Sequence, residues 1–185
     1  MIQEIHEYKV RVKAIGKLEL LPPKLREAGK ELSRCKDLVG KLNKVIDKHD
    51  DLKYSGLIYN AISEYVEASI LYSLVTNNHI PSCKELNVHH TPYVQGLADV
   101  IGELKRLALN SLMYEDIIKA FYYLELMDTI YNNLRVLNYP EPLLPGVRHK
   151  VDVGKKVIED LRSLLIDMKN RLELKKEISK LIKKP

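Results

Sequence analysis

The sequence predicts an all-α protein in a single domain over residues 1–185, a bundle of about six to seven long helices. No stretch combines sustained alternation of apolar and polar residues with β-branched enrichment, so strands are not expected. Apolar residues instead recur every three or four positions along most of the chain. With 185 residues, 45% of them hydrophobic and 30% charged, the chain can bury a substantial core and is not of the disordered class.

The first two helices are predicted on either side of a proline pair. Residues 2–20 have helical periodicity, and Pro22 and Pro23 then interrupt the chain. Pro23 suits the first turn of a second helix over residues 24–47, because a proline there loses no intrahelical hydrogen bond. The face of this helix opposite its apolar stripe carries Lys24, Arg26, Lys30, Arg34, Lys36, Lys41, Lys44 and Lys48. This face either binds phosphates or is a solvated surface interspersed with acidic residues.

A third helix is expected over residues 52–77, with Asp50 or Asp51 as its N-terminal cap. A connection over residues 79–90 follows, with a short helix at 83–86. Thr91 before Pro92 then predicts the start of a fourth helix that runs to about residue 113.

Two more helices complete the predicted bundle. The periodicity of residues 114–136 indicates a fifth helix, and three prolines then mark a loop. A sixth long helix is expected from Gly146 to a lysine-rich C-terminal end.

The third helix has an unusual charge pattern. From Tyr54 to Cys83 there is no Lys or Arg, although the chain has thirty of them, and the only charges are Glu64 and Glu67. A helix that is apolar on nearly every side is normally buried. Buried carboxylates are costly unless they are paired, protonated or bound to a metal, so these two glutamates are candidate functional residues.

The fourth helix has a second acidic pair, Asp99 and Glu103, spaced one turn apart, with Arg106 and Asn110 following on the same face. If the two helices pack face to face, four carboxylates converge. Oxygen ligands of this kind suit hard cations such as Mg²⁺ or Mn²⁺, which activate phosphodiesters for in-line attack. The alternative for Asp99 and Glu103 is a solvated helix face.

Two glycines, Gly96 and Gly102, lie inside the predicted fourth helix, where each costs about 1 kcal/mol relative to alanine. Such a glycine often permits close approach of a neighbouring helix or a ligand. We therefore expect tight packing along this helix.

Three segments resemble the translin superfamily, in particular its factor X branch. Residues 64–68, EYVEA, match that branch's acidic motif, and residues 93–111 match its YxxGxADxxGELxRxxxNS block. Residues 148–153, RHKVDV, are more loosely similar to its final helix. The resemblance covers about residues 50–170, whereas the N-terminal part and the basic clusters of the nucleic-acid surface have no clear counterpart.

The resemblance implies an all-α protein that assembles as a closed, roughly octameric homo-oligomeric barrel and binds single-stranded RNA or DNA. It also implies a metal-dependent endoribonuclease whose catalytic and metal-binding carboxylates are Glu64, Glu67, Asp99 and Glu103. Arg106 would orient Glu103 or contact the phosphate, and Asn110 would support the site. The nucleic-acid-binding residues stay unknown.

Other sites are weaker. A zinc site from His79, Cys83, His89 and His90 fits no known spacing, and a loop is the preferred interpretation. Four tyrosines are expected to serve packing rather than base stacking: Tyr122, Tyr123, Tyr131 and Tyr139.

The sequence also predicts a location in the cytoplasm. The two cysteines lack CxxC spacing and indicate a reducing compartment. The first ten residues lack the apolar core of a signal peptide, and Glu64 and Glu67 argue against a membrane span over residues 57–75.

The leading hypothesis is therefore an Mg²⁺-dependent endoribonuclease that acts on single-stranded RNA. The alternatives are a non-catalytic scaffold that binds single-stranded RNA or DNA, and a purely structural helical oligomer.

Overall fold

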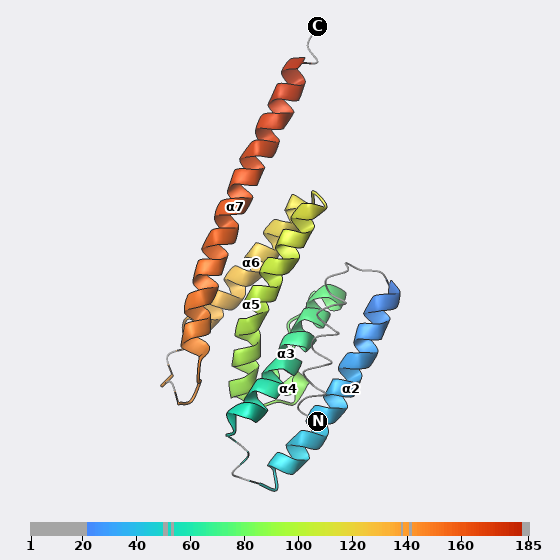
Figure 1. The fold of residues 1–185 in the computed structure, drawn as a ribbon, viewed down its shortest axis with the longest axis vertical. Helices are drawn as coiled ribbons and strands as arrows, with labels where there is room; N and C mark the ends of the chain where they lie inside the picture. Colours follow the sequence, from blue (N-terminus) through green and yellow to red (C-terminus); the bar gives the residue numbers. More distant parts are fainter. Residues whose placement is uncertain (1–21, 50–51, 53, 138, 141, 183–185) are drawn as a thin grey trace.

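The computed structural model describes residues 22–49, 52, 54–137, 139–140 and 142–182. Within this part of the chain all regular structure is helical, as predicted (Figure 1). The helices are α2 (Pro22–Ile46), α3 (Gly56–Asn77), α4 (Cys83–Leu86), α5 (His90–Met113), α6 (Ile117–Leu134) and α7 (Val147–Ile182). The helix predicted over residues 2–20 and the caps predicted at Asp50 and Asp51 lie outside the described residues.

The core lies where α3, α5, α6 and α7 pack together, while α2 covers the outer side of α3 (Figure 1). Ile70 on α3, Leu104 on α5, Met127 on α6 and Leu165 on α7 are all completely buried in one apolar cluster. Helix α3 is buried on most of its surface, which agrees with its lack of basic residues. No described helix has the length and apolar character needed to cross a bilayer.

Tight packing also joins α2 to α3. A Cβ at Gly29 would lie 2.6 Å from the Tyr72 hydroxyl oxygen, so the two helices approach closely there. Burial, followed by the negative charge of Glu31, raises the pKa of the Cys35 thiol on α2 from 9.0 to about 12.

Helix starts are the main difference from the sequence prediction. The α5 cap is His89, whose ring nitrogen Nδ1 accepts a hydrogen bond from the Thr91 backbone N–H at 3.3 Å. The prediction that Thr91 is the cap was wrong, because Thr91 lies within the first turn and its hydroxyl donates to the Leu143 carbonyl at 3.2 Å. A tertiary contact thus uses the group that the local pattern assigned to capping.

Helix α7 extends well beyond the bundle (Figure 1). Its first half is buried at regular intervals down to Leu165, whereas every residue from 169 to 182 is exposed. The exposed part is not uniformly polar, since Leu174, Ile178, Leu181 and Ile182 are 47–78% exposed. The outer half of α7 therefore presents apolar surface that no other described part of the chain covers.

Candidate functional site

Helices α3 and α5 approach each other most closely at Gly96. A Cβ at this position would lie 2.5 Å from the carbonyl oxygen of Ser63 and 2.8 Å from the Val66 Cβ. Only glycine fits there without moving the α3 backbone. The expectation for Gly96 is confirmed, but a Cβ at Gly102 would meet nothing within 4 Å, so close packing does not explain that glycine.

The two helices run in the same direction. His89, at the start of α5, stacks on Tyr59, near the start of α3, with ring centroids 6.1 Å apart. Further along both helices, Gly96 contacts Ser63 and Val66. Residues at equal distances from these contacts therefore lie at the same height along the two helix axes, and this places Glu67 at the height of Asp99.

Helical spacing relates the acidic residues to these contacts. On α5, Glu103 is seven residues after Gly96 and therefore lies on the same face, with Asp99 beside it. On α3, Glu67 follows the contact residue Val66 directly and is only 1% exposed, whereas Glu64 precedes Val66 by two positions, is half-buried and lies away from α5. The two acidic pairs thus lie on neighbouring helices, and the convergence of all four carboxylates stays a prediction.

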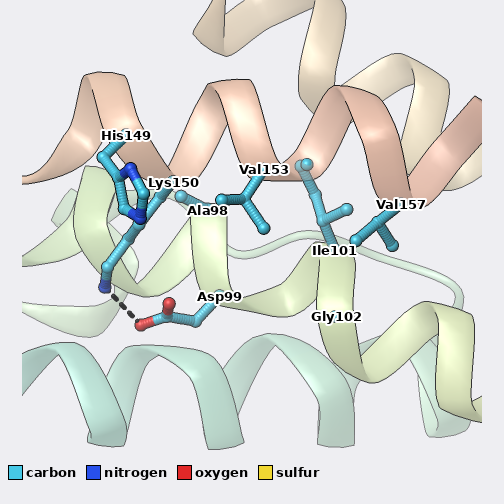
Figure 2. A pocket seen from close by; sticks show the side chains of 9 residues that line it. Ala98, Asp99, Ile101, Gly102, His149, Lys150, Val153 and Val157 are labelled. Atoms are coloured by element: carbon cyan, nitrogen blue, oxygen red, sulfur yellow. Dashed lines mark hydrogen bonds and ion pairs between the residues drawn. The ribbon is translucent and has the colours of Figure 1, made fainter.

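Asp99 itself is bound to a cation from α7. Lys150 Nζ donates to Asp99 Oδ2 at 2.7 Å, and the two side chains are 34% and 32% exposed (Figure 2). The pair lines a hollow of about 260 Å³ between α5 and α7, together with Gly102 and His149. An exposed pair of this kind stabilises a fold by only about 0–1 kcal/mol, so Asp99 can exchange this partner.

Two side chains of α5 fix the loop that leads into α7. The Gln95 amide Nε2 donates to the Pro145 carbonyl at 2.8 Å, and the Thr91 hydroxyl bonds the Leu143 carbonyl. Lys150 follows a few residues later, after Gly146 turns the chain with a φ of 74°. These contacts hold the first turn of α7 beside Asp99.

Glu103 forms an ion pair with Arg106 one turn further along α5. The pair is consistent with the one-turn spacing of the two residues, and the role of Arg106 in orienting Glu103 stays a prediction. Within the described part of the chain, the buried atoms Arg106 Nε and Asn110 Nδ2 have no hydrogen-bond acceptor. Both residues line a shallow hollow of about 320 Å³ with exposed Met113 at its edge.

The acidic residues are adjacent but do not form a ready-made metal centre. No three Asp, Glu, His or Cys side chains converge to hold an ion in the portion of the chain that the structure describes. Asp99 and Glu103 each contact a cationic side chain instead. The site thus has the ligand types for a hard cation, but two of its carboxylates, Asp99 and Glu103, form ion pairs with Lys150 and Arg106.

The histidine and cysteine cluster does not form a zinc site within the described residues either. Cys83 Sγ contacts His90 Nδ1 at 3.4 Å, and His79 Nε2 contacts Glu85 at 3.1 Å. Ser82 caps α4 in a capping box with Glu85, and hydrogen bonds from the Ser82 backbone and side chain, then from His79, lower the pKa of Glu85 to about 2.

Lys150 is the site residue that sequence reasoning missed. It lies 51 residues from Asp99, and no spacing rule connects the two positions. The only signal was the loose similarity of residues 148–153 to a final helix, which did not assign Lys150 a contact.

The chain is similar to several known proteins. It is 28% identical to an uncharacterised protein of Methanocaldococcus jannaschii over 150 residues. This aligned span covers 78% of this chain and 67% of the relative. The solved structure titled AfC3PO–duplex RNA complex superposes with a TM-score of 0.79 at 26% identity, over 92% of this chain and 86% of that chain. Apo-NeC3PO gives a TM-score of 0.71 at 24% identity, over 89% and 88%, and supports the fold.

The family comparison covers almost the whole chain. The model of the Translin family matches residues 1–171, which include both acidic pairs, Lys150 and the buried half of α7. The chain therefore belongs to the Translin family.

Proposed function

We propose that this protein binds RNA and cleaves it as a metal-dependent endoribonuclease in the cytoplasm. The observation that carries the proposal is the close approach of α3 and α5 at Gly96, which brings Glu67 level with Asp99. Glu64 and Glu103 lie one turn to either side of this level. Family membership and the similarity to a C3PO solved with duplex RNA support an RNA ligand.

The residues proposed to hold a divalent cation, Mg²⁺ or Mn²⁺, are Glu64, Glu67, Asp99 and Glu103. Their carboxylate oxygens fit such an ion, although Asp99 must first leave Lys150 and Glu103 must turn from Arg106. The bound cation would supply Lewis-acid activation of the phosphodiester.

The other side chains have separate roles in this proposal. Burial fixes Glu67 in position, since it is 1% exposed. Lys150 and Arg106 are released when the carboxylates turn, so they become available to the negatively charged phosphate. Asn110 Nδ2, which has no acceptor among the described residues, can donate to a phosphate oxygen nearby.

The proposed ligand is single-stranded RNA or DNA, with RNA as the cleaved substrate, because a flexible strand can enter between side chains more easily than a duplex. The related C3PO was solved with duplex RNA, so both forms belong in the assay.

We also propose that the chain assembles as a homo-oligomeric, octameric barrel. The apolar surface on the outer half of α7, with Leu174 62% and Leu181 68% exposed, needs a partner, and a second copy of the chain offers the same surface.

The test compares cleavage of a labelled single strand by the wild type, Glu67→Gln and Glu125→Gln in Mg²⁺ or Mn²⁺. Glu125 is an exposed glutamate on α6, so its variant is a matched control. We expect Glu67→Gln to lower the rate at least about 100-fold and to keep RNA binding, while Glu125→Gln behaves as wild type. Equal cleavage by all three proteins would remove the four carboxylates from the mechanism.

The second candidate function is a non-catalytic scaffold that binds RNA or DNA. Two observations favour it. The Lys150 ammonium is hydrogen-bonded to the Asp99 carboxylate, and no three carboxylates of the described residues converge. This function would be correct if the wild type binds RNA but cuts neither single-stranded nor duplex RNA with any divalent ion.

A further inference from the structure

Another hollow lies on the other side of α7 from Asp99. It has a volume of about 450 Å³ and is formed by the end of α6, the loop that follows and the first two turns of α7. This volume falls within the ~300–1,000 Å³ range of small-molecule pockets. Its floor is apolar, and its polar groups come from Arg135, Arg148 and Asp152.

The two arginines are available to a ligand. Both are exposed, and neither forms an ion pair with another residue in the described part of the chain. Arg148 also lies in the first turn of α7, which contains no acidic residue. A cation there is disfavoured by the positive end of the helix dipole, and a bound anion would relieve this repulsion.

Aromatic rings stand beside these charges. The Arg135 guanidinium lies 6.0 Å from the centre of the Tyr131 ring, and Tyr139 lines the same hollow while 61% exposed. Tyr123 is buried in the core, as expected for a packing tyrosine, whereas Tyr139 is not part of the core of this chain. An exposed ring beside a basic pocket is suited to stacking on a flat base.

We propose that this pocket binds a nucleotide. The phosphate would lie between Arg135 and Arg148, and the base would stack on Tyr139. The Asp152 carboxylate would accept a hydrogen bond from a ribose hydroxyl or a base amine. Inorganic phosphate alone fits less well, because it would leave the Tyr139 ring and the Asp152 acceptor unused.

This pocket is separate from the four carboxylates proposed to hold the divalent cation. Lys150 and Val153 face Asp99, whereas Arg148 and Asp152 lie on the opposite side of the same two turns of α7. Nucleotide binding there needs neither a metal nor cleavage. The pocket can accept a free nucleotide or the terminal nucleotide of an RNA strand, which share this chemistry.

The test is calorimetric titration of the full-length protein with AMP, adenosine and inorganic phosphate in EDTA, which removes divalent cations from the carboxylates. The variants are Arg148→Gln, Tyr139→Leu and Tyr139→Phe. Arg171→Gln is the control, because Arg171 is an exposed arginine on the outer half of α7, about 34 Å along the helix from Arg148. All of these positions are exposed, and circular dichroism verifies that each variant folds.

We expect AMP to bind more tightly than adenosine or phosphate. Arg148→Gln and Tyr139→Leu should each weaken AMP binding about tenfold or more, while Tyr139→Phe and Arg171→Gln keep it. The proposal is overturned if AMP shows no binding at about 1 mM, or if Arg171→Gln weakens it as much as Arg148→Gln.

A second arm identifies the source of the nucleotide. It compares 5′-phosphorylated and 5′-hydroxyl RNA strands on the Glu67→Gln background. A preference for the phosphorylated strand that Arg148→Gln abolishes assigns the pocket to strand ends. Equal binding of both strands, with AMP binding intact, assigns it to free nucleotides.

Discussion

Replacing Gly96 with alanine tests the packing that joins the two acidic pairs. The new Cβ would lie 2.5 Å from the Ser63 carbonyl oxygen, about 0.9 Å below the 3.4 Å at which ordinary contact begins. The clash is with backbone, so rotation of a side chain cannot relieve it. Overpacking of this kind costs about 1–3 kcal/mol. Alanine returns about 0.5–1 kcal/mol through its higher helix propensity. The net loss is then about 0–2.5 kcal/mol, and about 1–2 kcal/mol for values near the middle of both ranges.

The assay is thermal unfolding followed by circular dichroism at a fixed protein concentration. A loss of about 1–2 kcal/mol lowers the Tm of a chain of this size by about 2–8 °C. The matched control is Gly102→Ala on the same helix, where a new Cβ meets nothing within 4 Å. We expect that variant to gain about 0.5–1 kcal/mol from helix propensity. The reasoning is refuted if Gly96→Ala is as stable as the wild type, or if both variants shift in the same direction.

Three further predictions concern the charges, the thiol and the outer helix. Lys150→Gln removes the cation that competes for Asp99, so Mn²⁺ should bind more tightly by electron paramagnetic resonance titration; unchanged affinity would show that Lys150 does not compete. Because the Cys35 pKa is raised from 9.0 to about 12, unfolding releases a proton above pH 9, and the free energy of unfolding should fall by about 1.4 kcal/mol per pH unit. Urea titrations from pH 8.5 to 10 measure the free energy of unfolding at each pH. This free energy should fall less steeply with pH for Cys35→Ala than for the wild type, and an equally steep fall would contradict this account. Leu174→Asp with Ile178→Asp should reduce the assembly size in analytical ultracentrifugation without loss of the bundle, whereas an unchanged mass would exclude this surface from the interface.

Local pattern was sufficient to predict the helices of the described residues and the burial of Glu67. The absence of basic residues over residues 54–83 predicted a buried helix, and α3 is buried on most of its surface with Glu67 1% exposed. The short helix predicted at 83–86 is also present, and a capping box between Ser82 and Glu85 stabilises its start. In these segments the sequence neighbours themselves determine the structure.

Tertiary contacts account for what the sequence did not predict. Thr91 has the chemistry of a cap, but its hydroxyl bonds Leu143, 52 residues away. Gly96 and Gly102 look alike in the sequence, yet only Gly96 contacts α3. Lys150 meets Asp99 only because the loop before α7 is fixed on α5. The one-turn spacing of Glu103 and Arg106 was enough to predict their contact, whereas no local rule gives Lys150 as the partner of Asp99.

The length of α7 has a consequence for the lifetime of the unassembled chain. Its exposed outer part, residues 169–182, is about 21 Å long, and a free helix of about 14 residues is only marginally stable in water. It also contains lysines and arginines that trypsin recognises, among them Lys169, Arg171 and Lys175. In an isolated chain this segment should unwind often and be cleaved early, whereas contact with another copy would protect it. The rate of trypsin cleavage after these residues would then report how much of the protein is assembled.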